Sequence, residues 1–283
     1  MGMVKLLDDA QNGLTRNTYE YLLGGSPDEL TPQFLQGNLD IIAVPSNLAS
    51  IIYNNTNGAA RIISVVSGGI FYIVEFGGEE VHSIADLKDR EMFSAGRGAA
   101  PDFAMRFIFE ENGMSFDNDI YVDWRVEPTE ILALMSTMEH ALALLPQPFV
   151  TVAQTQLPGL RIAIDLNEEW NALDTDSQFV TTVLIARTEF LEQNLGAVEI
   201  FLEEFAASTD FVNNNLEEGA ALIEQFGIIA APIAQRAIPY CNLVSITGPE
   251  MMRIMRGYLE VLYGIAPQSI GGALPSDDFY HGV

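Results

Sequence analysis

The chain has 283 residues, enough for about two domains, and a hydrophobic fraction of 48% with a charged fraction of 18% excludes global disorder. Thirteen lysines and arginines against 39 aspartates and glutamates give a net charge of −26, which repels nucleic acid and anionic membrane surfaces. The same charge favours a soluble monomer that resists aggregation.

The single cysteine, Cys241, excludes an intrachain disulfide, and three histidines far apart in the sequence argue against a structural zinc site. No apolar run reaches the ~18–20 residues of a membrane span. The first residues, MGMVKLLDDAQNG, contain acids and no apolar stretch, so they are not a signal peptide. We expect no metal and no cofactor, and a protein that is either cytoplasmic or a mature segment that has lost its leader.

In chain order, apolar periodicity, glycines and capping residues predict strands that alternate with helices. The run LDIIAV at 39–44 lacks alternation, which predicts a strand buried on both faces, as in a parallel sheet. The expected helices are 3–10, 26–37, 45–55, 98–113, 127–138, 147–156, 167–173, 188–215, 216–227, 231–240 and 248–265. The expected strands are 17–25, 39–44, 60–67, 69–77, 119–126, 140–146, 161–166 and 178–187, with a short helix and a strand within 82–96.

Two long apolar strands, at 70–76 and 179–187, bracket a complete α/β block in the middle of the chain. A chain that leaves one domain, forms a second and returns must cross twice, and two crossover strands make a hinge between lobes. The expected fold class is therefore α/β with two lobes. Lobe one would contain residues 1–76 and 177–283, and lobe two residues 77–176, with a ligand cleft between them.

Four loops that follow apolar strands are expected to meet at this cleft, because the carboxyl ends of parallel strands lie at one edge of a sheet. Glycines in SAGRGAAP (94–101) let the backbone approach a ligand, although the nucleotide fingerprint G-x-G-x-x-G is incomplete at Pro101. A plain strand-to-helix turn is the alternative for this loop. The predicted ligand-binding residues are Pro45, Ser46, Asn47, Ser67, Gly68, Gly69, Ser94, Gly96, Arg97, Gly98, Ala99, Glu130 and Gln147.

Several of these side chains also have a structural explanation. Ser46 and Asn47 suit helix capping as well as ligand contact. Glu130 falls in the first turn of an expected helix, where the helix dipole explains a carboxylate slightly better than a ligand does. Gln147 lies between two prolines that fix the backbone, and its amide can both donate and accept hydrogen bonds. Arg97 could point to solvent and leave only its N–H in the cleft.

The sequence contains no recognisable pairing of a nucleophile with a base. The motifs G-x-S-x-G, H-E-x-x-H and C-x-x-C are absent, and we interpret Cys241 as a buried structural thiol. Paired carboxylates such as Glu168 and Glu169 fall in helix first turns and need no catalytic role. Trp124 and Trp170 are expected in the core or at its rim. These features favour a binding protein over an enzyme.

Four segments, in this order along the chain, carry a resemblance to a known family: FLQGNLDIIAVPSNLAS, GIFYIVEFG, HSIADLKDREMFSAGRGAAPDFAMRFIFEENG and LALLPQPF. Together they resemble the substrate-binding proteins of ABC importers, in the group related to the nitrate, sulfonate, taurine and thiamine-precursor binding proteins. The S-I-x-D-L-K segment before a G-x-G-x-x-P loop is the most specific part. The tail IGGALPSDDFYHGV resembles the C-terminal end of one lipoprotein branch.

The resemblance implies a type II periplasmic-binding fold, extracellular capture of a small solute and delivery to a membrane permease. The family's exported forms carry a signal peptide, often with a lipidated cysteine, and neither occurs in this sequence. The family also begins with a strand and a glycine-containing loop before the helix matched by 3–10, so contacts from that loop cannot be named. Many relatives have Glu at the position of Gln147, and an amide there would change the charge that the ligand can carry.

Two other functions stay open at this point. An enzyme of the same two-lobed architecture, similar to a menaquinone-pathway lyase, needs only a polar cleft, whereas thiamine-pyrimidine synthases need clustered cysteines that this chain lacks. An interaction module that has lost its ligand would have a cleft filled by bulky side chains. The ligand itself also stays open, since one guanidinium, one carboxylate, hydroxyls and amides suit an oxyanion as well as a neutral or zwitterionic heteroaromatic.

Overall fold

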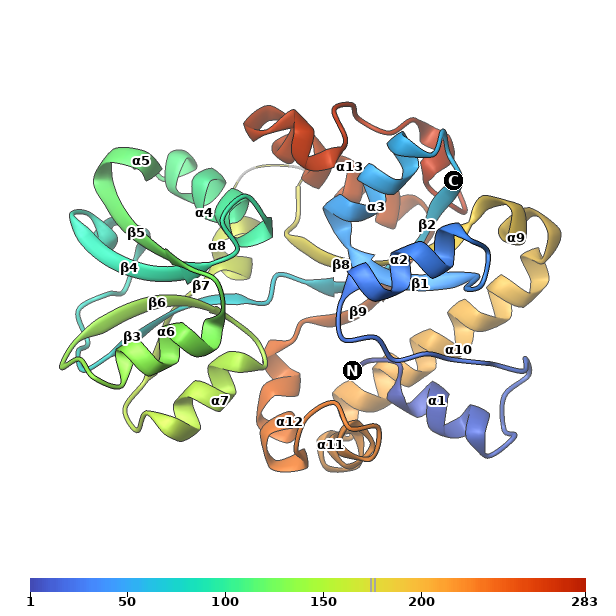
Figure 1. Ribbon diagram of the computed structural model, residues 1–283, viewed down its shortest axis with the longest axis horizontal. Coiled ribbons are helices and arrows are strands. Elements are labelled where there is room, and N and C mark those ends of the chain that lie inside the picture. Colours follow the sequence, from blue (N-terminus) through green and yellow to red (C-terminus); the bar gives the residue numbers. More distant parts are fainter. Residues whose placement is uncertain (174, 176) are drawn as a thin grey trace. The chain divides into compact units, whose positions relative to one another are not determined.

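The computed structural model describes all residues except 174 and 176, and the chain divides into two compact units (Figure 1). The first unit contains residues 1–68 and 180–283, and the second contains residues 69–179. The chain thus leaves the first unit once, completes the second and returns. Each unit has its own sheet and its own core.

A four-stranded antiparallel sheet forms the centre of the first unit. In spatial order its strands are β1 (Ile41–Pro45), β8 (Val180–Arg187), β2 (Ala60–Gly68) and β9 (Leu243–Ile246).

Strand β1 contradicts the prediction of a parallel strand buried on both faces. It pairs with β8 in antiparallel register, with Val44 opposite Val183, and it lies at an edge of the sheet. Ile42 and Val44 are buried, whereas Ala43 is exposed. The unbroken apolar run concealed this alternation, because a small apolar side chain is tolerated on the solvent side of a strand.

Helices pack against this sheet, and the N-terminal and C-terminal parts of the chain both contribute them (Figure 1). Leu6 and Phe205 come from α1 and α10, and they share one apolar cluster with Leu184 of β8. The single helix expected over 188–215 is two helices, because the backbone leaves the helical conformation at Asn194 (φ −131°, ψ 36°). The helices of this unit are α1 (Val4–Gln11), α2 (Pro27–Leu35), α3 (Ser46–Asn55), α9 (Thr188–Gln193), α10 (Leu195–Asn214), α11 (Leu216–Gln225), α12 (Ala231–Ala237) and α13 (Gly248–Ile265).

The strand predicted over 17–25 does not form within the described chain. Asn17 instead donates a hydrogen bond to the carbonyl oxygen of Ala197, and Leu22 and Leu23 are 50% and 51% exposed. A strand needs a partner strand for its backbone hydrogen bonds, and none of the described strands pairs with this segment.

The second unit is built on a five-stranded mixed sheet, in which β4 is parallel to β5 and β6, and β3 is antiparallel to β6 and β7. The boundary expected after residue 76 is therefore wrong, because the pairing of β3 places residues 69–76 in this unit; residues 177–179 also belong to it. In spatial order the strands are β5 (Ile120–Arg125), β4 (Arg90–Ala95), β6 (Ala141–Pro146), β3 (Phe71–Phe76) and β7 (Arg161–Asp165). The helices are α4 (Ala100–Glu111), α5 (Phe116–Asp119), α6 (Pro128–Met135), α7 (Phe149–Gln156) and α8 (Leu166–Ala172).

An aromatic stack joins the two ends of the second unit, where the chain enters it and leaves it. The Phe179 ring stacks on Trp170, with ring centroids 5.1 Å apart, and on Phe71, with centroids 6.0 Å apart. Gly69 donates its N–H to Oδ1 of Asn167 at 2.9 Å. Trp170 is fully buried, as predicted for a core residue. The two chain crossings are thus held together by packing inside this unit.

Candidate functional site

Two of the four predicted ligand loops meet at one edge of the second unit's sheet. Strands β4 and β6 are parallel neighbours, with Ser94 opposite Leu144, and they end at Ala95 and Pro146. The loops that follow therefore leave the sheet at the same level. The sequence-based expectation for these two loops required this parallel arrangement, and the structure confirms the arrangement.

Gln147 has an unusual environment for a polar side chain. It is 4% exposed, and its Oε1 accepts hydrogen bonds from the N–H of Thr151 at 3.3 Å and from Oγ1 of Thr151 at 3.0 Å. Its Nε2 is buried and has no hydrogen-bond partner in the described chain. Buried donors are nearly always paired, because an unpaired one loses its hydration without compensation. Nε2 is therefore a candidate ligand-binding atom.

The glycine loop after β4 is more self-contained than the sequence suggested. Gly96 and Gly98 have φ values of 81° and 74°, a conformation that favours glycine. The N–H of Gly98 bonds to Oδ2 of Asp102 at 2.8 Å, and the N–H of Ala99 bonds to the carbonyl oxygen of Gly96 at 3.0 Å. A carboxylate four residues later thus already binds the N–H of Gly98.

Arg97 protrudes from this loop into solvent and has no ion-pair partner in the described chain. Most other lysines and arginines pair with carboxylates, as Arg106 does with Asp102 at 2.8 Å. Behind Arg97, helix α4 begins without a side-chain cap on its first N–H groups. A free guanidinium beside an uncapped helix start is a suitable environment for an anion. Ser94, in contrast, is fully buried and bonds locally to the carbonyl oxygen of Ala95.

Glu130 lies in the first turn of α6 and is exposed. Its Oε1 is 3.4 Å from Nη1 of Arg125, which also bonds to Asp123. An ion pair and the helix dipole thus account for Glu130 without a ligand.

In the first unit, the loop from β1 to α3 uses its polar side chains internally. Ser46 is buried and donates to the carbonyl oxygen of Val180 at 2.7 Å, so it does not cap α3. Asn47 donates to the carbonyl oxygen of Ser269 at 3.1 Å. Pro45 ends β1, and these bonds fix the chain direction immediately after it.

The end of β2 is held in a similar way. The hydroxyl of Ser67 donates to the carbonyl oxygen of Cys241 at 3.1 Å, and Thr181 donates to the carbonyl oxygen of Gly68 at 2.6 Å. The N–H of Gly68 bonds to the carbonyl oxygen of Asn242. Sequence patterns could not reveal these partners, because they lie more than 100 residues away.

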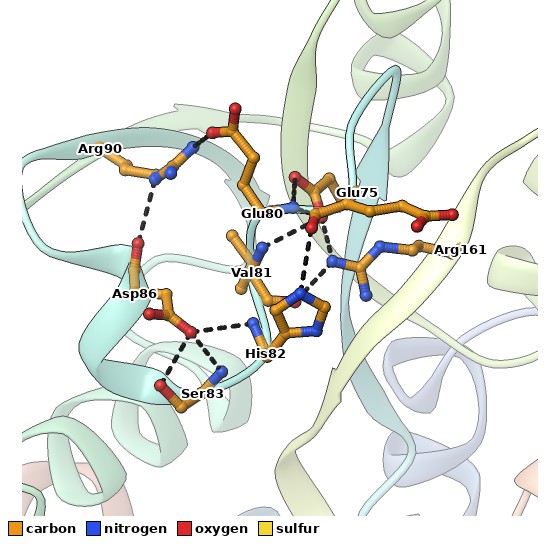
Figure 2. Close-up of polar contacts among 9 residues, drawn as sticks. Glu75, Glu80, Val81, His82, Ser83, Asp86, Arg90 and Arg161 are labelled. Carbon is orange, nitrogen blue, oxygen red and sulfur yellow. Dashed lines mark hydrogen bonds and ion pairs between the residues drawn. The ribbon is translucent and has the colours of Figure 1, made fainter.

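The opposite edge of the second unit's sheet contains a dense polar network (Figure 2). Glu75 is 4% exposed and accepts hydrogen bonds from the N–H groups of Glu80 and Val81 and from Arg161. Burial acts to raise the pKa of Glu75, but these donors outweigh it, and the pKa lies below its ordinary value. The network anchors the loop after β3.

A cavity of about 350 Å³ opens beside this network, with Phe76 and Leu142 among its apolar lining. Among the charged side chains around it, Arg90 pairs with Glu80 at 2.8 Å and Glu75 pairs with Arg161. It lies at the ends of β3, β4 and β6 that are remote from Arg97 and Gln147. The network and the cavity were not predicted from the sequence.

The described part of the chain was also searched for a metal site, a membrane-spanning helix and a reactive thiol. No group of three or more acidic, histidine or cysteine side chains there could hold a metal ion. No described helix is long and apolar enough to cross a membrane. Cys241 is buried, and burial raises the pKa of its thiol to about 11, as suits a structural thiol.

Comparison with known proteins identifies the fold. The chain is similar to the solved structure of an ABC transporter protein from Parabacteroides distasonis, with 20% identity, a TM-score of 0.81, and 99% of this chain and 95% of that chain covered. It is also similar to the periplasmic aliphatic sulphonate-binding protein SsuA from Escherichia coli, with 14% identity, a TM-score of 0.75, and 96% and 86% covered.

A third similar structure is that of the desulfurization enzyme DSZB, with 10% identity, a TM-score of 0.62, and 85% and 82% covered. No protein-family model matches the sequence, and no curated protein matches it either. These likenesses confirm the predicted fold class: the chain has the two-lobed α/β fold of type II periplasmic binding proteins. The chain is also similar to the ligand-binding component of an ABC-type import system from Staphylococcus aureus, with 14% identity, a TM-score of 0.66, and 99% and 92% covered.

Proposed function

We propose that this protein is the extracellular solute-binding component of an ABC importer, which captures a small molecule and delivers it to a membrane permease. The observation that carries the proposal is the likeness to an ABC transporter protein over 99% of the chain. The protein would act without catalysis, as a monomer that binds no nucleic acid, either as a lipoprotein or free in the periplasm. The net charge of −26 supports the monomeric state and the absence of nucleic-acid binding.

The residues that we propose to bind the solute lie in the loops 45–47, 67–69, 94–99 and 146–148, together with Glu130. Within the second unit, Gln147 supports this placement because its buried Nε2 has no partner in the described chain. The solute classes under consideration are nitrate, sulfonates, thiamine precursors and aromatic acids.

A thermal-shift screen of the full chain against these four solute classes tests the proposal. A solute at 100 times its dissociation constant stabilises the protein by about 2.7 kcal/mol, which raises the unfolding temperature measurably. The proposal requires at least one solute that does so and that isothermal titration calorimetry confirms with one site per chain. Failure of every class to bind would contradict it.

An enzyme of the same fold is the second candidate, favoured by the likeness to DSZB. The two functions can be distinguished by whether the bound molecule is released unchanged or is converted into a product. A transport protein returns its solute unchanged, so mass spectrometry after prolonged incubation should recover the intact compound. Conversion of a bound compound into a new product would favour the enzyme.

A further inference from the structure

We propose that Gln147 sets the charge preference of the proposed solute site, because Thr151 locks its amide so that only N–H donors remain for the solute. The inference rests on the proposed function and names the solute class: a small organic molecule that presents a carboxylate, sulfonate or phosphate group. Thr151 acts through Gln147 and is a positioning residue.

The orientation of the amide follows from the chemistry of its partner. The backbone N–H of Thr151 is a donor only, so the Gln147 atom 3.3 Å from it must be the carbonyl oxygen Oε1. The Thr151 hydroxyl bonds to the same oxygen at 3.0 Å. Rotation of the amide by 180° would set Nε2 against that N–H, donor against donor. Thr151 is 1% exposed, so water cannot readily replace it.

This lock leaves Nε2 with hydrogen atoms to donate and no acceptor in the described chain. Oε1, the only acceptor of the side chain, is already occupied. A solute that offers a lone pair satisfies Nε2, and an anionic oxygen does so most strongly, because hydrogen bonds to ionised groups are shorter and stronger. A solute that offers a cationic N–H group would leave two donors facing each other.

Arg97 supplies positive charge at the same level of the sheet. In the register of β4 and β6, Ser94 lies opposite Leu144, and Arg97 and Gln147 each follow three positions later. Arg97 has no ion-pair partner in the described residues, although the chain contains 39 acidic residues. The uncapped start of α4, a helix of 12 residues, follows directly. The nearest carboxylate along the chain, that of Asp102, binds the N–H of Gly98 and is paired with Arg106.

The test uses the full chain, isothermal titration calorimetry and charge-matched probes: butanesulfonate and benzoate as anions, butylamine and benzamidine as cations. The wild-type protein should bind at least one anion and prefer it to the cation of similar shape. Gln147→Glu should weaken the binding of that anion at pH 7 by tenfold or more. Gln156→Glu makes the same charge change at an exposed position of α7 and should alter affinity by less than twofold.

A pH series separates specificity from damage to the fold. Protonation of the carboxylate introduced by Gln147→Glu restores a donor and removes the repulsion, so the variant should regain anion affinity as the pH falls, whereas the wild-type protein should show no such rise. Thr151→Val should reduce the preference for anions, and Thr151→Ser should keep it. A misfolded variant would recover at no pH.

The outcomes distinguish this inference from the proposed function. If the wild-type protein prefers a cationic probe, or if Gln147→Glu binds the anion as well as Gln156→Glu does, the charge preference assigned to Gln147 is wrong and solute binding still stands. If no probe of either charge binds and the solute screen is also negative, the proposed function fails and this inference falls with it.

Discussion

A β-carbon on Gly69 would lie 2.4 Å from Cδ1 of Phe179, closer than such atoms approach in folded proteins. Gly69 is the first residue of the second unit and Phe179 is the last, so the contact joins the two chain crossings. Phe179 cannot move away easily, because it is stacked between Phe71 and Trp170. The absence of a side chain at Gly69 is therefore a packing requirement.

Gly69→Ala should destabilise the protein by about 1–3 kcal/mol, because the added methyl group forces the aromatic stack apart. Urea unfolding followed by circular dichroism measures the change. The matched control is Gly264→Ala in α13, where an added β-carbon meets no atom within 4 Å, and that variant should gain up to about 1 kcal/mol. Equal stability of the two variants would show that the Gly69 contact relaxes at no cost.

The lowered pKa of Glu75 makes a prediction about acid stability. A carboxyl group whose pKa is lower in the folded than in the unfolded state stabilises the fold above the unfolded value, near 4.5, and loses that contribution as the pH falls through its folded value. Glu75→Gln should therefore cost about 1–3 kcal/mol at pH 7. The difference from wild type should shrink steadily below pH 4.5.

Urea unfolding of both proteins between pH 7 and pH 3 measures this difference. Glu79→Gln is the control, because Glu79 is exposed and, among the described residues, its contact is the one between its backbone carbonyl and the His82 ring. It should stay within about 0.5 kcal/mol of wild type at every pH. A Glu75→Gln penalty that is independent of pH would mean that packing, and not charge, holds the network of Figure 2 together.

Cys241 should resist alkylation in the folded protein. Its thiol is buried and burial raises its pKa to about 11, whereas the unfolded thiol has a pKa near 8.5. Iodoacetamide at pH 8 should therefore react at least about a hundredfold more slowly with native than with urea-unfolded protein. Because the chain has one cysteine, mass spectrometry follows a single site. A native rate close to the unfolded rate would contradict both the burial and the structural role.

The correct fold class could be predicted because apolar periodicity and capping signals are local, and they marked nearly every helix and strand of both units. The failures concern partners that are distant in sequence. The segment 17–25 has a strand pattern but no partner strand in the described chain, and residues 69–76 join the second unit because β3 pairs with β6 and β7. Neither the missing partner strand nor the pairing of β3 can be predicted from the local sequence pattern.

The candidate site shows the same division. Gln147 was selected for its place between two prolines after an apolar strand, which depends on local sequence alone. Thr151 follows Gln147 by four residues, and Asp102 follows Gly98 by four residues. This spacing could have revealed the bond within each loop, since residues four apart lie close together at a helix start. The bonds of Ser46 to Val180 and of Ser67 to Cys241 required the folded chain.

Asp102 should hold the loop 96–99 in shape through the bond from its carboxylate to the N–H of Gly98. It is 4% exposed and also binds Arg106, so it is a buried, fully used carboxylate. Asp102→Ala removes a hydrogen bond to a charged acceptor, which is worth about 1.5–3 kcal/mol, and the Gly98 amide should then exchange with deuterium at least about tenfold faster. Asp117→Ala is the control, because Asp117 binds Arg106 from an exposed position and does not touch Gly98. Amide exchange resolved by NMR measures both variants, and an unchanged Gly98 rate in Asp102→Ala would show that the glycines alone hold the loop.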